Sequence, residues 1–450
     1  MQFMSRVYIK TYGCQMNERD SEQVASSLLE RGYSLVGNEK EADIVLLNTC
    51  SVREQAEVKA IGKAGHVLSK KKKDKKFILG IMGCMAQNKG DDLTKLLPKL
   101  DLVAGTQKFH RIPDFLDTLK NQKSTLKSPI IELAEEENSQ DYIKNHIISP
   151  ANSVSAFVSI MQGCNMNCSF CIVPKTRGRE RYRTINEIVE EVVNLTFKGV
   201  KEITLLGQIV NAYGRGVFKR MDNKTPFVQL LEKLHAIKDL ERIRFTSPHP
   251  SSFGDDLIDS FSHLEKLGSY AHIPMQSGSD KILKSMNRPY TRSKFIKLVR
   301  KLRDANPNMR LSTDVIVGYP GEEEEDFEQT KDLFIEAGFE MAFIFKYSER
   351  SGTHASRLDD KVPQNVKEKR NQELLSILES QSIASNQKLI DSQVDVLVEG
   401  KARKGEGALT GRTPCFRKVV FLAEKRLIGN IVPVRITNVS TNTLFGETVS

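Results

Sequence analysis

The sequence predicts a mixed α/β protein in three parts: an open parallel α/β domain, a partial (β/α)6 barrel, and a small β-barrel. Apolar runs alternate with helical patterns over residues 1–120, and about six further strand–helix repeats follow residue 155. Short alternating segments then fill the end of the chain. The length of 450 residues allows two or three domains, each with its own core.

The amino-terminal domain, residues 1–120, contains apolar runs that each end at a cysteine. The carboxyl ends of parallel strands meet at one edge of a sheet, where open α/β sheets bind ligands. Thiols at these ends would converge, which predicts a site for a metal cluster. Buried cysteines that act as small hydrophobic residues are the alternative. The runs and their cysteines are Val7 to Tyr12 with Cys14, Asp43 to Leu47 with Cys50, and Phe77 to Met82 with Cys84.

Residues 121–155 are polar and are predicted to form a linker, and residues 156–383 contain the repeats of the central domain. Amphipathic stretches at 185–197 and 295–302 are typical of helices between strands. Six repeats are too few for a closed eight-stranded barrel, so we expect an open one. The predicted strands are Ala156 to Met161, Glu202 to Leu206, Arg242 to Thr246, Tyr270 to Met275, Leu311 to Val317 and Met341 to Tyr347.

The most specific signal is a run of three cysteines directly after the first of these strands. Cys164, Cys168 and Cys171 have the spacing Cys-x3-Cys-x2-Cys, with no fourth cysteine and no histidine close by. Thiolates bind iron–sulfur clusters, and three thiolates on a four-iron cluster leave one iron open to a small molecule. A structural zinc site would need a fourth ligand. The spacing therefore favours a cluster over zinc or inert core thiols.

Residues 384–450 are predicted to form a small barrel of the OB type, a common RNA-binding module. We expect its strands to be antiparallel. A barrel that only packs against the central domain is the alternative. Cys415 has no companion cysteine and is expected to be a structural or free thiol. The predicted strands are Val394 to Glu399, Lys418 to Phe421, Ile431 to Thr437 and Asn442 to Gly446.

The composition excludes a membrane protein and favours a polyanionic partner. Hydrophobic residues make up 39% of the chain. No apolar run approaches the ~18 residues of a membrane span, and Met1 to Ser5 does not resemble a signal peptide. Cysteines in a cluster-like arrangement indicate a reducing cytoplasm. The net charge of +10 points to nucleic acid, whereas the lysine run at 70–76 is expected to be a solvated loop.

The Cys164 motif resembles that of the radical S-adenosylmethionine (SAM) enzymes. In that family the open iron binds the amino and carboxylate groups of SAM, and an electron from the cluster cleaves SAM into methionine and a 5′-deoxyadenosyl radical. Two segments near the carboxyl terminus, 411–413 and 444–446, resemble the TRAM domain attached to tRNA-modifying enzymes. The usual companion residues of that domain are absent around Pro414 to Phe416.

This order of domains is that of the methylthiotransferases, which the chain resembles over nearly its whole length. Several motifs are similar to the branch that makes 2-methylthio-N6-dimethylallyladenosine in tRNA. They are Gly13 to Asn17 with Asp20 to Glu22, Asn48 to Glu54, Cys171 to Pro174 with Arg177 to Glu180, and Gln276 to Ser279. The chain departs from the family pattern at Arg181 to Arg183 and at Ile209.

The resemblance implies two 4Fe–4S clusters and SAM as cofactors. Cys164, Cys168 and Cys171 would hold the cluster that cleaves SAM. A cluster on Cys14, Cys50 and Cys84 would carry or donate sulfur, and a second SAM would provide the methyl group. The product would be a methylthio group on C2 of N6-isopentenyladenosine at tRNA position 37, next to the anticodon. That C–H bond has no useful acidity, so acid–base chemistry has little to act on. A radical made by the cofactor can abstract the hydrogen atom instead.

The resemblance also implies further contacts and partners. Gln208, after Gly207, and Gln276 lie at strand ends where SAM would bind, and Asp314 is comparable. Either glutamine could instead be a packing residue. The partners would be a tRNA anticodon stem-loop, recognised through single-stranded bases and phosphates, and an external electron donor of the flavodoxin or ferredoxin type. We expect a cytoplasmic monomer.

Three other functions compete with this one. Related methylthiotransferases act on threonylcarbamoyladenosine in tRNA or on an aspartate of a ribosomal protein. A non-catalytic iron–sulfur protein that binds RNA is the alternative from another class. Reductive cleavage of SAM would separate the last of these from every enzyme.

Overall fold

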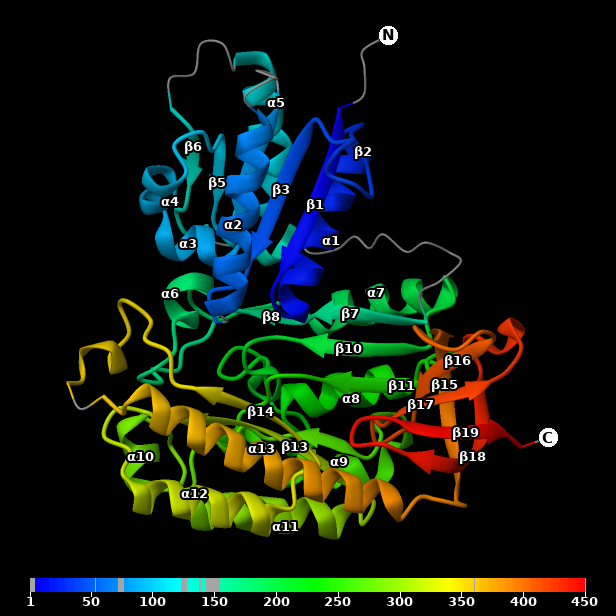
Figure 1. The fold of residues 1–450 in the computed structure, drawn as a ribbon. Coiled ribbons are helices and arrows are strands. Elements are labelled where there is room, and N and C mark those ends of the chain that lie inside the picture. Colours follow the sequence, from blue (N-terminus) through cyan, green and yellow to red (C-terminus); the bar gives the residue numbers. More distant parts are fainter. Residues whose placement is uncertain are drawn as a thin grey trace.

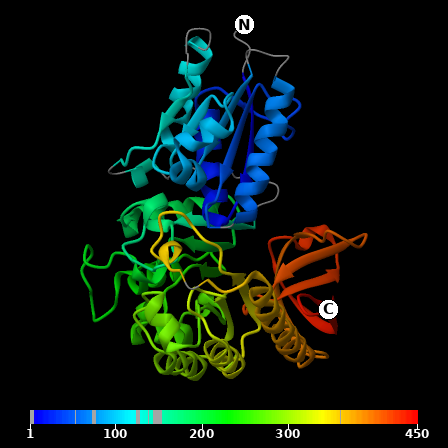
Figure 2. The ribbon, with the colours of Figure 1, turned by 60° about the vertical axis from the view of Figure 1, so that its left-hand side comes forward.

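The structure of the chain, a computed structural model, describes residues 5–52, 54–71, 77–122, 128–136, 139–142, 154–359 and 361–449. Parts of the predicted linker and of the lysine run at 70–76 lie outside these ranges. The amino-terminal domain stands over the central domain, and the carboxyl-terminal barrel lies at one end of the central strands (Figures 1 and 2). The predicted α/β fold class is confirmed.

The amino-terminal domain is built on a parallel sheet in the order β2-β1-β3-β4-β5-β6. β3 and β4 are buried at every position, as expected for central strands covered on both faces. β6 lies within the segment predicted as a linker and pairs with β5. The strands are β1 (Arg6–Tyr12), β2 (Ser34–Leu35), β3 (Ile44–Thr49), β4 (Ile78–Met82), β5 (Leu102–Ala104) and β6 (Ile130–Glu132). The helices are α1 (Gln15–Glu30), α2 (Glu54–Lys71), α3 (Cys84–Lys89), α4 (Asp91–Leu96) and α5 (Ile112–Gln122).

The central domain contains two groups of parallel strands, β11-β10-β7 and β12-β13-β14. Among the described residues β7 and β14 do not pair with each other, so the barrel is open as predicted. One apolar cluster joins both groups to the helices that cover their outer face. The strands are β7 (Ser155–Ser159), β10 (Glu202–Leu206), β11 (Arg242–Phe245), β12 (Tyr270–His272), β13 (Arg310–Val317) and β14 (Met341–Lys346).

The helices of the central domain follow the strands in alternation. α7 coincides with the amphipathic stretch predicted at 185–197 and begins with a capping box between Thr184 and Glu187. None of the helices in the described ranges is long and apolar enough to cross a membrane. The helices are α6 (Val173–Arg177), α7 (Ile185–Phe197), α8 (Pro226–His235), α9 (Asp255–His263), α10 (Asp280–Ser285), α11 (Arg292–Ala305), α12 (Glu324–Ala337) and α13 (Gln364–Gln387).

The carboxyl-terminal strands form a closed barrel in the order β15-β16-β17-β19-β18. The pair β17–β19 is parallel, so the expectation of a wholly antiparallel barrel is wrong there. β19 is antiparallel to β18, which is antiparallel to β15, so β19 runs in the same direction as β15. β17 also runs in that direction, because β16 is antiparallel to both β15 and β17. β16 was not predicted, since Gly411 interrupts its alternating pattern. The strands are β15 (Gln393–Lys401), β16 (Ala408–Arg412), β17 (Lys418–Leu422), β18 (Ile431–Val439) and β19 (Leu444–Thr448).

The barrel docks on the central domain through the loop between β16 and β17. Arg244 of β11 donates to the carbonyl of Thr413 at 3.0 Å, and its guanidinium lies 4.6 Å from the ring centroid of Phe416. Arg310 of β13 donates to the carbonyl of Phe416 at 3.2 Å, and that ring also packs on Tyr270. Arg310 and Tyr270 are the first residues of β13 and β12, and Arg242, the first residue of β11, donates to the carbonyls of Arg412 and Asp395 in the barrel. The barrel therefore docks at the end of the central domain opposite to the carboxyl-terminal strand ends.

Candidate active site

The first cysteine loop follows the carboxyl end of β7. The chain forms a short strand, β8 (Met161–Gln162), and then turns at Gly163, whose φ is +85°. A Cβ atom there would lie 1.9 Å from the carbonyl oxygen of Arg179, so only glycine fits. The backbone N–H of Cys164 donates to Gly178 at 3.1 Å. These contacts fold the loop back against the segment that follows it.

The three thiols of this loop lie within electrostatic range of one another. Burial raises the pKa of Cys164 to about 11 and that of Cys171 to about 12, and the neighbouring thiols add to both shifts. Arg288 donates from Nη1 to Sγ of Cys168 at 3.2 Å, and the backbone N–H of Met166 donates to Sγ of Cys164 at 3.4 Å. Without a metal the buried thiols are held neutral, whereas a metal centre would deprotonate them.

The second group of cysteines lies at the carboxyl ends of β1, β3 and β4, which are neighbours in the sheet. Cys14 precedes α1, Cys50 follows β3 and Cys84 begins α3. A hydrogen bond with Cys50, together with the positive charge of Arg177, lowers the pKa of Cys14 to about 6. Burial raises the pKa of Cys84, and the charge of Cys14 adds to this shift. The structure thus brings the three thiols together, as their strand positions predict.

Arg177 connects the two groups of cysteines. It ends α6, the short helix that follows Cys171, and its Nη2 lies 2.6 Å from Oδ2 of Asp20 on α1. Burial by itself would lower the pKa of Arg177, but the charges of Asp20, Cys84 and Cys14 raise it. The side chain therefore remains a cation. Its Nη1 atom is buried and has no hydrogen-bond partner in the part of the chain that the structure describes.

The donor set of the second group fits an iron–sulfur cluster. No three His, Cys, Asp or Glu side chains in the described ranges could share a single metal ion. A cubane cluster makes no such demand, because each thiolate binds a different iron. Arg177 Nη1 and the hydroxyls of Thr49 and Ser51, on either side of Cys50 in the sequence, are buried donors with no hydrogen-bond partner among the described residues. The sulfides of an anionic cluster would accept from them.

The two glutamines predicted to contact SAM have different surroundings. The side-chain oxygen of Gln208 accepts from the backbone N–H of Gly163 at 2.5 Å, so it supports the cysteine loop. Gln276 is buried and has a φ of +65°, and its backbone bonds Asp314 and Ile316 of β13 at 2.8 and 3.0 Å. Both lie at the carboxyl ends of strands. Direct contact of either side chain with SAM stays a prediction.

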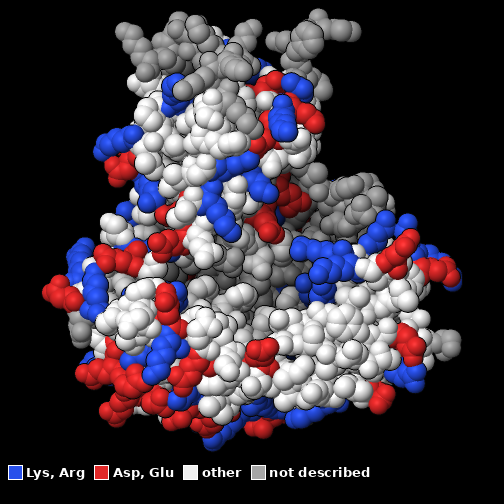
Figure 3. Space-filling model, in the orientation of Figure 1, with Lys and Arg blue, Asp and Glu red and all other residues white. Residues whose placement is uncertain are grey.

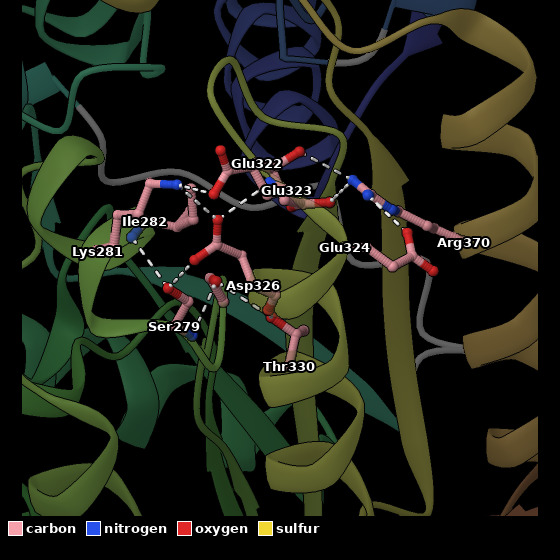
Figure 4. Close-up of polar contacts among 10 residues, drawn as sticks. Ser279, Lys281, Ile282, Glu322, Glu323, Glu324, Asp326, Thr330 and Arg370 are labelled. Atoms are coloured by element: carbon pink, nitrogen blue, oxygen red, sulfur yellow. Dashed lines mark hydrogen bonds and ion pairs between the residues drawn. The ribbon is translucent and has the colours of Figure 1, made fainter.

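A polar network holds the loop that carries Gln276. Ser279 caps α10 and donates to Oδ1 of Asp326 at 2.6 Å, and Lys281 lies 3.1 Å from the same carboxylate (Figure 4). Arg370 of α13 bonds Glu322 at 2.7 Å, next to the start of α12. The acidic run at 322–326 therefore ties the loop to α12 and α13.

Two cavities lie beside the Cys164 loop. The one lined by Cys164 itself has a volume of about 340 Å³ and includes Glu135, from the segment after β6. It therefore reaches from the cysteine loop to the amino-terminal domain. A larger cavity of about 650 Å³ is lined by the loop and by Lys281 and Lys284 of α10. None of the six cysteines lines it, so the smaller cavity is the better candidate for the reaction.

Comparisons with known proteins agree with this geometry. The model of the radical SAM superfamily matches residues 158–334, that of the TRAM domain matches 387–449, and that of the uncharacterized protein family UPF0004 matches 6–105. The tRNA-2-methylthio-N(6)-dimethylallyladenosine synthase of Opitutus terrae is 50% identical and covers 99% of this chain and 97% of its own. The synthase of Akkermansia muciniphila is 46% identical and covers 98% of both chains.

The chain belongs to this family of synthases. Its radical SAM domain implies SAM and 4Fe–4S clusters as cofactors of the synthase. Among solved structures, the radical SAM methyltransferase TsrM of Kitasatospora setae gives a TM-score of 0.57 at 12% identity, covering 79% of this chain and 77% of its own. The cobalamin-dependent SAM radical enzyme OxsB gives a TM-score of 0.54 at 12% identity, and the match covers 85% of this chain and 56% of OxsB. These two likenesses concern the fold alone.

Several residues of the synthase's site were not assigned roles from its sequence. Arg177 and Asp20 belong to motifs that carry the family resemblance, but nothing local indicates that they pair. Arg288 and the hydroxyls of Thr49 and Ser51 were not singled out. Thr49 and Ser51 stand on either side of Cys50, within the motif from Asn48 to Glu54, and this position is the signal that could have suggested them.

Proposed function

We propose that the protein is a radical SAM methylthiotransferase that adds a methylthio group to C2 of N6-isopentenyladenosine at tRNA position 37. The observation that carries this proposal is the arrangement of two cysteine trios on facing edges of two domains, joined by Arg177. Relatives at 46–50% identity are named for the product that this reaction would give.

Each trio has its own role in this proposal. Cys164, Cys168 and Cys171 hold one 4Fe–4S cluster and leave an iron open for SAM, while Cys14, Cys50 and Cys84 hold the second. Bound SAM and its cluster supply a radical that can abstract an unactivated hydrogen. The chain's own contribution is to hold both sites at one interface and to bury Cys50, Cys84 and Cys164 away from water.

The charge distribution suits a tRNA substrate. Lys and Arg side chains lie on both sides of the hollow between the amino-terminal domain and the carboxyl-terminal barrel, with Asp and Glu side chains beside those of the amino-terminal domain (Figure 3). Phosphate contacts supply much of the affinity of a protein for RNA. Because the barrel docks at the far end of the central strands, an RNA held by the barrel would have to extend along this face to reach the cysteines.

We infer a cytoplasmic monomer that receives electrons from a flavodoxin or ferredoxin.

The direct test is the reaction of anaerobically reconstituted protein with SAM, a reductant and one of three substrates. The substrates are tRNA carrying isopentenyladenosine, tRNA carrying threonylcarbamoyladenosine, and ribosomal protein. Mass spectrometry of digested products should find the methylthio group only on the isopentenylated nucleoside. Modification of either other substrate would replace the proposed one. Absence of both product and 5′-deoxyadenosine would favour a non-catalytic RNA-binding protein.

A further inference from the structure

Two phenylalanines on β14 are exposed although they lie on a strand of the central domain. Phe343 is 45% exposed and Phe345 is 39% exposed. Their rings are nearly parallel, with an interplanar angle of 15° and centroids 6.4 Å apart. Large apolar side chains on a barrel strand normally bury themselves in the core. The exposure of both rings is therefore unusual for this position in the fold.

The two rings point away from the helices. Ala342 and Ile344, which alternate with them along the strand, pack against the apolar cluster beneath the helices. Phe343 is paired with Asp314 of β13 and lies 6.3 Å from the ring of His272, centroid to centroid. His272 in turn bonds Asp314 at 3.2 Å. The exposed rings thus face the inner side of the open barrel, beside a pair of polar side chains.

The segment that follows β14 contacts the residues next to Cys50, in the second group of cysteines. Just beyond it, Ser348 bonds Glu54 of α2 at 2.6 Å, and Arg350 donates to the carbonyl of Val52 at 3.0 Å. The N–H of Val52 donates to Sγ of Cys50 at 3.2 Å.

The Cys164 loop contacts the same end of β14. Phe345 is paired with Ile316, which packs against the apolar cluster that also receives Phe170 of the Cys164 loop. Contacts from the carboxyl end of β14 therefore lead to both groups of thiols.

We propose that Phe343 and Phe345 form the platform on which the prenylated adenine of the substrate lies. This inference rests on the proposed function and names the subsite for its reacting nucleoside. A purine with a branched five-carbon substituent on N6 offers a flat face and an apolar tail. Flat faces stack on aromatic rings, and the tail loses water on contact with them. His272 and Asp314 supply polar groups beside the rings, as is usual in ligand sites.

The test compares Phe343→Ala and Phe345→Ala with the wild-type holoenzyme. Anticodon stem-loops with and without the isopentenyl group serve as ligands, and their binding and the KM of the prenylated one are measured. Each variant should raise this KM about tenfold. Each should also reduce the preference for the prenylated stem-loop, which a merely structural role would not change. Phe343→Tyr and Phe345→Tyr, which keep the ring, should behave like wild type.

Two controls complete the experiment. Phe197→Ala removes a ring that is 92% exposed at the end of α7 and should change nothing. SAM cleavage without RNA should be equal in all variants. Unchanged KM and preference in both Ala variants would overturn the platform. Loss of SAM cleavage would assign the rings to SAM instead and overturn it as well. The assay of methylthio product, run in parallel on wild-type protein, distinguishes failure of the platform from failure of the proposed function. If wild-type protein makes no methylthio product, the proposed function itself fails.

Discussion

Arg177 and Asp20 form a buried ion pair, 2.6 Å between Nη2 and Oδ2, although they are 157 positions apart in the sequence. Asp20 lies on α1, the helix that Cys14 precedes, and Arg177 ends the helix that follows Cys171. The pair therefore joins the segments that carry the two groups of thiols. A domain movement that separated them would leave two buried charges without partners.

Replacing Arg177 by Gln should destabilise the protein and change the second cluster. Removal of one partner of a buried ion pair costs about 3–5 kcal/mol of unfolding free energy. Loss of a positive charge near Cys14 and Cys84 should also shift the reduction potential of the cluster there to a more negative value. Urea unfolding and a redox titration followed by electron paramagnetic resonance measure the two effects.

The control for this variant is Lys95→Gln, which breaks an exposed pair with Asp92. It should change the unfolding free energy by less than about 1 kcal/mol and leave both clusters unchanged. If Arg177→Gln were as stable as wild type and kept the same potential, the ion pair would not couple the two sites.

Iron content tests the number of clusters. The reconstituted protein should hold about eight irons per chain if both clusters are of the 4Fe–4S type. Replacing Cys164, Cys168 and Cys171 together by Ala should remove about half of the iron and all SAM cleavage. Cys415→Ala should lose none, because that thiol bonds only Thr413 and Arg417 among the described residues. Full iron retention in the triple variant would contradict the assignment.

The carboxyl-terminal barrel should contribute to tRNA affinity through its exposed cations. Deleting the barrel would uncover the buried Arg244 and Arg310, so substitutions are the cleaner test. Lys401, Arg403 and Lys404 are exposed, and changing all three to Ala should weaken tRNA binding and flatten its salt dependence. SAM cleavage without RNA should persist. Lys294, Lys297 and Arg300, exposed on α11, provide the matched control. An unchanged salt slope would show that the barrel only packs against the central domain.

Asp326 should make stability depend on pH in the acid range. Burial would raise its pKa, but hydrogen bonds from Ser279 and from the N–H of Glu323, with the charge of Lys281, lower it below the ordinary value. A carboxyl group whose pKa is lower in the folded state stabilises the fold at pH values above its ordinary pKa of about 3.9. This stability is lost as the pH falls through the pKa of the folded state.

Substitution isolates that contribution of the carboxylate. Asp326→Asn should reduce the unfolding free energy at pH 7, and its difference from wild type should shrink as the pH falls below about 4. Urea unfolding at several pH values measures this difference, with the exposed neighbour Glu325→Gln as control. A difference that did not vary with pH would mean that the network acts without the charge of Asp326.

Much of the site was predictable because it depends on local patterns. Each of Cys14, Cys50 and Cys84 follows a strand, and parallel topology alone brings strand ends together. The Cys164 loop was predictable from spacing. The pairing of Arg177 with Asp20 was not, because a contact between distant residues leaves no periodic signal.

Two strands and one contact were not predicted, for similar reasons. β6 has only three residues in a polar segment, and β16 contains Gly411, which has no side chain to mark its alternation. The hydrogen bond between Gln208 and Gly163 was not predicted, because it depends on how the loop folds, which sequence spacing does not reveal. The contact of Gln208 with SAM stays a prediction.

The most direct test of the account is whether the two groups of cysteines have separate roles. A variant with Cys14, Cys50 and Cys84 replaced by Ala is reconstituted and supplied with SAM, reductant and isopentenylated tRNA, and both products are quantified together. We predict that 5′-deoxyadenosine still forms, because the Cys164 site is intact, and that no methylthio nucleoside appears. Methylthio product from this variant, or loss of SAM cleavage in protein that remains folded, would contradict the account.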